Sequence, residues 1–224
     1  MTSFNKYGLH ENLIKSIASL KFKTPTLIQD KVIPEILSSK IDLIATAQTG
    51  TGKTAAFGLP LIHLTNNKIK MIEAIILCPT RELCIQITKD LNSYSEYIKN
   101  YEVVSIYGGS RVDVQLKALK NNPKIIVCTP GRLNDLINRK KINLDYIKYF
   151  VLDEADEMLS MGFKEEIDTI IDKTPIDKNI YLFSATISKK VQKITKEYME
   201  NPIRISTAVE NSAADDVKHI YYLI

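Results

Sequence analysis

Residues 47–54 join glycines, a lysine and a threonine in a spacing that suits phosphate binding. Gly50 and Gly52 would let backbone N–H groups turn toward phosphate oxygens, and a helix starting after them would add its N-terminal dipole. Lys53 would reach the β- and γ-phosphates, while the Thr54 hydroxyl would ligate Mg²⁺. The alternative is an ordinary glycine loop with a chance Lys-Thr pair, and the strict pattern begins with glycine where this chain has alanine. The residues assigned to nucleotide binding are Ala47, Gln48, Thr49, Gly50, Thr51, Gly52, Lys53 and Thr54.

Two adjacent carboxylates, Asp153 and Glu154, follow an apolar run and form the second candidate group. Asp153 would hold Mg²⁺ through water, and Glu154 would polarise an attacking water as general base. Taken alone, the pair could equally be solvated carboxylates at the start of a helix, where acidic side chains are favoured. Because the Lys53 loop is present as well, we predict that Lys53, Asp153 and Glu154 are catalytic.

The elements that must position these groups repeat one pattern: an apolar run, a polar or glycine-bearing motif, then an amphipathic stretch. The apolar runs are rich in β-branched residues and mostly do not alternate, which indicates strands buried on both faces of a parallel sheet. Helical spacing is clear in residues 163–171 and 191–198. We predict an α/β domain, a mostly parallel β-sheet with helices on both faces and its site at the carboxyl ends of the strands. The predicted strands are residues 43–45, 74–77, 103–106, 125–127, 150–152 and 181–183.

The chain changes character after Ser206. Residues 1–206 are expected to form the nucleotide-binding domain. Residues 207–216 are small and polar, as is typical of a linker. Residues 217–224 are apolar and strand-like, and we expect them to begin a second domain that is truncated here.

Composition narrows the class of protein. A chain of 224 residues with 45% hydrophobic and 25% charged residues suits a soluble globular protein, and a net charge of +4 permits a polyanionic partner without requiring one. Cys78, Cys84 and Cys128 form no CxxC pair and have no metal-ligand spacing with a histidine, which favours a reduced, intracellular protein. No apolar stretch is long enough to span a bilayer, and the N-terminus has no signal-peptide core.

Together with Asp-Glu-Ala-Asp at residues 153–156, the motifs after the other strands resemble the N-terminal RecA-like P-loop domain of a DEAD-box RNA helicase. The resemblance covers residues 4–224, and residues 153–163 are most similar to bacterial members. It implies ATP and Mg²⁺ as cofactors, RNA as partner, a second RecA-like domain, a cytoplasmic location and no membrane association. It also implies RNA-stimulated ATP hydrolysis coupled to duplex unwinding. Without the arginines of a second domain, we expect this chain alone not to unwind RNA.

The resemblance assigns adenine binding to Phe22, Thr24 and Gln29. A glutamine amide can donate and accept at adenine N6 and N7 together, and an aromatic ring can stack on the base. The family often has glycine where this chain has Lys21. General burial trends alone would instead place Phe22 in the core and Gln29 on the surface.

Three motifs after strands are expected, from the resemblance, to face RNA. Their small residues, helix starts and arginines suit a sugar–phosphate backbone rather than base edges, so no sequence specificity is expected. Arg81 and Arg132 could instead be structural partners of carboxylates such as Glu82 or the 153–156 segment. Cys84 replaces a common alanine. The predicted RNA-binding residues are Pro79, Thr80, Arg81, Gly108, Gly109, Thr129, Pro130, Gly131 and Arg132.

Ser184 and Thr186 are the last predicted catalytic residues. In the family that the chain resembles, these hydroxyls interact with the acidic motif and couple the nucleotide site to the RNA site. The alternative is that they cap a helix beginning near Ile187.

Two competing functions remain open at this level. One is a P-loop motor that acts on DNA, against which the Asp-Glu-Ala-Asp spelling and the motif around Gln29 argue. The other is a non-catalytic RNA-binding or scaffold module, against which the complete set of catalytic residues argues.

Overall fold

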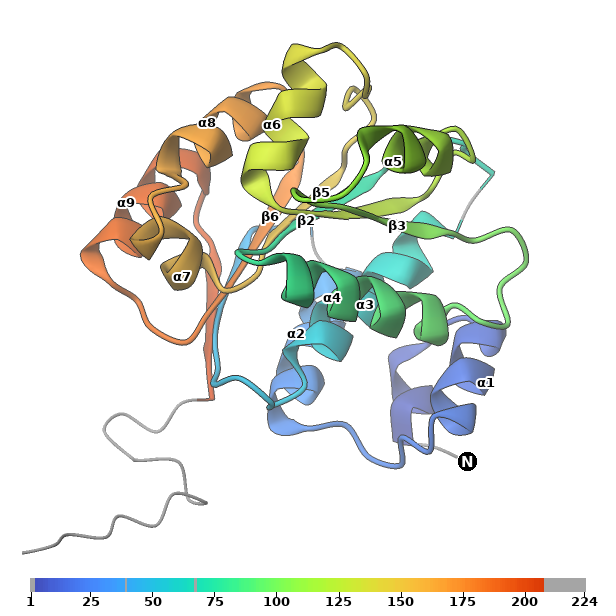
Figure 1. Cartoon of the computed structure of the whole chain (residues 1–224). Helices are drawn as coiled ribbons and strands as arrows, with labels where there is room; N and C mark the ends of the chain where they lie inside the picture. The colour runs from blue at the N-terminus through green and yellow to red at the C-terminus, as the bar shows by residue number, and fades with distance from the viewer. Residues whose placement is uncertain (1–2, 39, 67, 208–224) are drawn as a thin grey trace, which may run out of the picture.

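The computed structural model describes residues 3–38, 40–66 and 68–207, and within them one parallel sheet forms the centre of the domain (Figure 1). The strand order is β3-β4-β2-β5-β6-β1-β7, and every neighbouring pair is parallel. The predicted fold class is therefore confirmed. The strands are β1 (Leu43–Thr46), β2 (Ala74–Leu77), β3 (Val103–Ile106), β4 (Ile125–Cys128), β5 (Tyr149–Leu152), β6 (Asn179–Ser184) and β7 (Ile203–Ser206).

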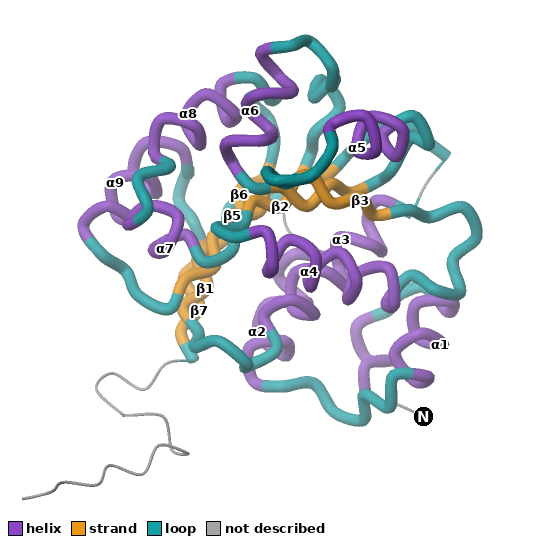
Figure 2. Tube along the Cα trace, viewed as in Figure 1, coloured by secondary structure: helices purple, strands orange, loops and turns teal. Residues whose placement is uncertain are grey.

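Helices cover both faces of this sheet, and each face has its own apolar core (Figures 1 and 2). Helices α1 to α4 pack on one face, and α5 to α9 pack on the other. The helices are η1 (Ser3–Tyr7, a 3₁₀ turn), α1 (Glu11–Ser19), α2 (Leu27–Ser38), α3 (Lys53–Thr65), α4 (Arg81–Tyr94), α5 (Val112–Leu119), α6 (Pro130–Asn138), α7 (Ala155–Ser160), α8 (Lys164–Asp172) and α9 (Lys189–Tyr198).

Strand β2 shows why the central strands are apolar throughout. Ala74 and Ile76 pack into the first core, while Ile75 and Leu77 pack into the second. Successive strand residues point to opposite faces, so a strand covered on both faces has no position left for a polar side chain. The same reason explains why the sequence shows no alternation at this strand.

Strand β7 is the element that the sequence analysis missed. It extends the sheet beside β1, with Ile203 N–H bonded to the Asp42 carbonyl and Thr207 N–H bonded to the Thr46 carbonyl. As an edge strand it alternates between sheltered and exposed residues over four positions, and that is too short a pattern to identify from sequence. The strand ends at Ser206, the predicted end of the domain.

Most of the predicted linker and the strand-like segment at residues 217–224 lie outside the described residues. Among the helices that are described, none combines the length and hydropathy needed to cross a membrane. Cys78, Cys84 and Cys128 are free thiols and are fully buried, as expected for small core residues.

The N-terminal segment is held to α3 by two stacked histidines. The His10 and His63 rings lie 4.2 Å apart between centroids, and the His10 backbone N–H donates to His63 Nδ1 at 3.2 Å. Burial, and then the neighbouring His10, lower the pKa of His63 below its ordinary value of 6.5. The contact therefore needs His63 to be neutral.

We predict that this contact is lost in mild acid. The unfolded chain binds the His63 proton more readily than the folded chain, so stability holds above pH 6.5 and falls as the pH drops toward the lowered pKa. His63→Asn keeps an acceptor near the Nδ1 position and does not titrate. Urea unfolding of both proteins from neutral to mildly acidic pH should show a shallower decline for His63→Asn. Identical declines would contradict the assignment.

Candidate active site

The loop of residues 47–54 connects β1 to α3 and takes the conformation that its glycines allow. Gly50 and Gly52 have positive φ angles of 82° and 93°, and a Cβ at Gly52 would also collide with the Gln29 amide nitrogen. Glycine is therefore required at Gly52 for two reasons. Ala47, the departure from the strict pattern, is fully buried, and its N–H donates to the Ser184 carbonyl, so its methyl group is simply part of the core.

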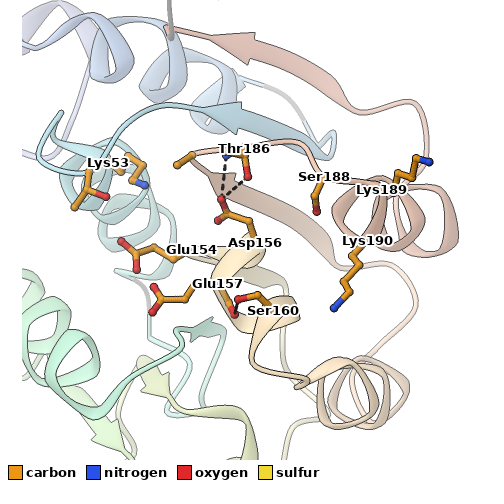
Figure 3. Close-up of a pocket in the computed structure, with 11 residues that line it drawn as sticks. Lys53, Glu154, Asp156, Glu157, Ser160, Thr186, Ser188, Lys189 and Lys190 are labelled. Carbon is orange, nitrogen blue, oxygen red and sulfur yellow. Dashed lines mark hydrogen bonds between the residues drawn. The ribbon is translucent and has the colours of Figure 1, made fainter. Parts of the chain in front are cut away.

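Lys53 opens α3 and is the most unusual charge in the site. Its side chain is 6% exposed, and its Nζ has no hydrogen-bond partner among the described residues. A buried ammonium without a partner is costly, so the geometry favours a ligand that brings negative charge. In Figure 3, Lys53 and Glu154 lie on one side of a cleft that has Lys189 and Lys190 on the other. This cleft has a volume of about 620 Å³.

Asp153 and Glu154 lie where β5 gives way to α7. Asp153 is 3% exposed, and its carboxylate accepts the Glu154 N–H at 3.1 Å. Burial raises the pKa of Asp153 to about 6, although the Lys53 charge opposes the shift. Burial, a hydrogen bond with Glu157 and the Asp153 charge raise the pKa of Glu154 to about 7. Two adjacent carboxylates with raised pKa values at the end of a strand are typical of a site that binds a cation or moves protons.

The alternative for this pair, solvated carboxylates that cap a helix, is wrong. Glu154 is the N-cap residue of α7, but its side chain makes no capping hydrogen bond. It instead has a left-handed backbone with φ of 52°, a costly conformation for a residue with a Cβ. Strain of this kind is common at functional sites, and here it sets the direction of the side chain after the strand.

Ser184 and Thr186 tie the end of β6 to the acidic motif. Asp156 accepts hydrogen bonds from the Thr186 N–H at 3.0 Å and from the Thr186 hydroxyl at 2.7 Å. The Ser184 hydroxyl donates to the Thr186 carbonyl at 2.6 Å. Burial raises the pKa of Asp156, but the hydrogen bonds from Thr186 and Ser184 outweigh it and hold the pKa below its ordinary value. The expected link between these hydroxyls and the acidic motif is therefore present.

The alternative in which Ser184 or Thr186 caps the following helix is wrong. Helix α9 begins at Lys189, and Ser188 is its cap, with its hydroxyl accepting the Val191 N–H at 3.3 Å. The sequence has three hydroxyl side chains near the start of α9. Only the fold shows which of them caps the helix and which ones link to the acidic motif.

Gln29 is buried, contrary to the general trend for glutamine, and it touches the phosphate loop. Its Oε1 accepts the Thr26 N–H at 3.0 Å, and its Nε2 donates to the Gly52 carbonyl at 3.1 Å. A primary amide has two donors and two lone pairs, so one of each remains after these two bonds. The remaining N–H donor and the remaining oxygen lone pair are what a bidentate contact with an adenine edge requires.

Phe22 is aligned by the end of α1. The Lys21 N–H bonds to the Ala18 carbonyl and the Phe22 N–H bonds to the Ile17 carbonyl, the paired bonds of a left-handed helix terminus. The Phe22 ring then packs, partly buried, against Phe4 and Tyr94, at centroid distances of 6.4 and 6.0 Å. Thr24, two residues on, is exposed. The Phe22 ring is thus packed against the core on one side and partly exposed on the other.

Lys21 takes a left-handed backbone with φ of 60°, the conformation that glycine adopts at the least cost at the end of a helix. We predict that Lys21→Gly stabilises the domain by about 0.5–1 kcal/mol, because relief of the left-handed strain exceeds the extra chain entropy. For a chain of this size the melting temperature should rise by about 1–4 °C. Lys23→Gly is the matched control, since Lys23 has no such backbone strain, and it should lower the melting temperature. No gain in Lys21→Gly would refute the explanation.

The motifs expected to face RNA lie together on the other half of the same sheet edge, after β2, β3 and β4. Thr80 caps α4 by accepting the Leu83 N–H at 3.2 Å, Thr129 precedes α6, and Pro130 is its first residue. The Arg81 guanidinium lies over the Tyr107 ring at 5.1 Å, beside Gly109. Pro79, Gly108 and Gly131 complete this edge.

The alternative in which the two arginines pair with carboxylates is wrong for the part of the chain that the structure describes. Arg132 donates to the Ser110 carbonyl and to Gln115 Oε1, both neutral acceptors, at 3.1–3.3 Å. Arg81 has an aromatic ring as its partner. Sequence reasoning missed Gln115, and its helix gives no signal that singles it out, because Asp113 and Lys117 are polar residues of the same helix.

Comparison with known proteins agrees with this geometry. Residues 26–194 match the DEAD/DEAH box helicase family. The chain is 48% identical, over 90% of its length, to the ATP-dependent RNA helicase CshA of Listeria monocytogenes, and 41% identical to DeaD of Buchnera aphidicola subsp. Schizaphis graminum. It spans 38% and 37% of those two proteins. A DEAD box protein from Methanococcus jannaschii is similar in structure, with a TM-score of 0.86 and 45% identity over 93% of this chain and 56% of that one.

Proposed function

Because the chain belongs to the DEAD/DEAH box helicase family, we propose that it is the ATP-binding N-terminal domain of an ATP-dependent RNA helicase. The observation that carries the proposal is the buried Lys53 ammonium at the start of α3, which has no hydrogen-bond partner among the described residues and interacts with the Asp153 charge. Since the chain spans less than half of its curated relatives, unwinding is assigned to this domain together with a second one. Free, buried thiols and an RNA substrate suit a cytoplasmic protein.

We propose that ATP lies across the carboxyl ends of β1, β5 and β6. The backbone N–H groups of residues 47–54 and the start of α3 would hold the phosphates, and the Lys53 ammonium would neutralise the β- and γ-phosphates. Gln29 would hydrogen-bond the adenine edge with the half of its amide that remains free, while Phe22 and Thr24 border the base. Because Gln29 also bonds the Gly52 carbonyl, base and phosphate recognition share one side chain.

Residues suited to Mg²⁺ lie beside Lys53. The Thr54 hydroxyl and the Asp153 carboxylate are hard oxygen donors, and Mg²⁺ commonly uses one or two such groups together with substrate phosphates and water. Among the described residues, no cluster of three or more acidic, histidine or cysteine side chains could hold a metal, which fits an ion bound largely by nucleotide and water. When bound, the ion would neutralise charge on the phosphates.

Hydrolysis is assigned to Glu154, which would accept a proton from the attacking water. A carboxylate with a pKa near 7 is well matched to that task at neutral pH. Asp156 would hold Thr186 and Ser184 in register with this base, so that movement of the β6 end changes the acidic loop.

RNA would bind along the motifs after β2, β3 and β4, through its sugar–phosphate backbone. Small residues at Gly108, Gly109 and Gly131 permit close approach, and Arg81 and Arg132 bring positive charge. Because these groups recognise the backbone, binding should be salt-sensitive and independent of base sequence.

We predict that the chain binds ADP more tightly than GDP, and that Gln29→Ala narrows the difference. Loss of a bidentate base contact costs ADP binding about 1–3 kcal/mol. Loss of the Gln29 bond to the Gly52 carbonyl should weaken the binding of ADP and GDP alike. Calorimetry with ADP and GDP on the wild type and the variant measures the ratio. Equal affinities in the wild type would refute adenine selection.

We predict that Glu154→Gln retains ATP and RNA binding but lowers hydrolysis by about 10²–10⁴-fold, since it removes a positioned general base. Steady-state hydrolysis should be measured, with RNA and with DNA, on a form of the protein as long as its relatives. Glu165→Gln is the matched control, because it makes the same chemical change at an exposed glutamate of α8 that does not line the cleft. Stimulation by DNA instead of RNA would refute the proposed substrate, and normal turnover in Glu154→Gln would refute the base.

A further inference from the structure

Gln115, on α5, is a buried polar residue at the centre of the edge that faces RNA in the proposed function. It is 5% exposed, and it is the one buried residue of its helix. Its Nε2 donates to the Tyr107 carbonyl at 2.9 Å and to the Ser110 hydroxyl, and its Oε1 accepts from Arg132 at 3.1 Å. One amide thus joins both ends of the turn around Gly108 and Gly109 to α6.

Arg132 completes this network from the other side. Its Nη1 and Nη2 both donate to the Ser110 carbonyl at 3.3 Å, in addition to the Gln115 bond. A guanidinium has five donors, so the three bonds leave two for another acceptor. Arg132 is therefore held in one orientation and still has two N–H donors for another acceptor.

The turn that Gln115 holds needs support because it follows the edge strand. β3 has a neighbour on one side only, and Gly109 takes a left-handed φ of 79°. Arg81 reaches the same turn, with its guanidinium over Tyr107. Both arginines assigned to RNA are thus placed by the segment that Gln115 fixes.

We infer that Gln115 is a positioning residue for RNA binding: it sets the turn of residues 107–110 and orients Arg132, without touching RNA itself. The inference rests on the proposed function. Its physical basis is preorganisation, because an arginine already fixed in its bound rotamer loses less entropy when it meets a phosphate. A neutral, buried amide adds no charge to the interface, so its effect on affinity should not depend on salt.

The test is Gln115→Met, which keeps the length of the side chain and removes its polar atoms. Binding of a labelled single-stranded oligouridine should weaken by about two- to tenfold, the range expected for releasing one ordered side chain. The slope of log affinity against log salt should stay at the wild-type value. Arg132→Met should instead reduce that slope by about 0.7, as for one lost phosphate contact. ADP affinity should be unchanged in both variants.

Gln192→Met on α9 is the matched control, since it makes the same chemical change at an exposed glutamine far along the chain. Should the methionine variant fail to fold, Gln115→Asn keeps an amide on a stem too short to bond both the Tyr107 carbonyl and Arg132, and it should likewise weaken oligouridine binding while leaving ADP affinity intact. Wild-type RNA affinity in a folded Gln115→Met protein would overturn the inference alone, as would equal losses of RNA and ADP affinity. Absence of RNA binding by the wild type at low salt would overturn the proposed RNA function as well.

Discussion

The buried Lys53 ammonium group, which has no hydrogen-bond partner among the described residues, is the constraint on which this site depends. Lys53 is held in place by the helix that it begins, because α3 is buried between the sheet and its neighbouring helices, and its side chain faces the cleft. The Asp153 charge acts on Lys53, but the burial of Asp153 raises its own pKa and weakens that compensation. An ammonium that is buried and only partly compensated favours an anionic ligand, and nucleotide phosphate would supply the negative charge.

Around this charge, the loops after three adjacent strands are joined by direct hydrogen bonds. Ala47, before the phosphate loop, donates to the Ser184 carbonyl at the end of β6. Ser184 bonds Thr186, and Thr186 bonds Asp156 in the first turn of α7, after β5. Because β5, β6 and β1 are neighbours in the sheet, these contacts are short and need no long side chains. Through these hydrogen bonds, a change at the γ-phosphate would therefore shift both the acidic motif of residues 153–156 and the end of β6.

The same edge of the sheet is divided into two halves. β1, β5 and β6 carry the groups proposed to act on the nucleotide, and β2, β3 and β4 carry those proposed to meet RNA. The halves meet where the Asp153 N–H bonds the Leu77 carbonyl across the β2–β5 pair. Motifs that alternate along the sequence are thus sorted in space by strand order. The sequence could place each motif after a strand, but strand order depends on long-range packing, which spacing along the chain does not encode.

The sequence by itself determined the fold class and six strands of the sheet, and it pointed to the candidate phosphate-binding residues and carboxylates, because each depends on local composition. Only the tertiary structure decided the tasks of chemically equivalent side chains: Ser188 rather than Ser184 caps α9, and Gln115, which lies in no motif, holds the turn of residues 107–110. β7 escaped detection for the same reason, since it is a strand only through its bonds to β1. A hydroxyl, an amide or a short edge segment can bond many partners, and packing between distant segments selects which one it meets.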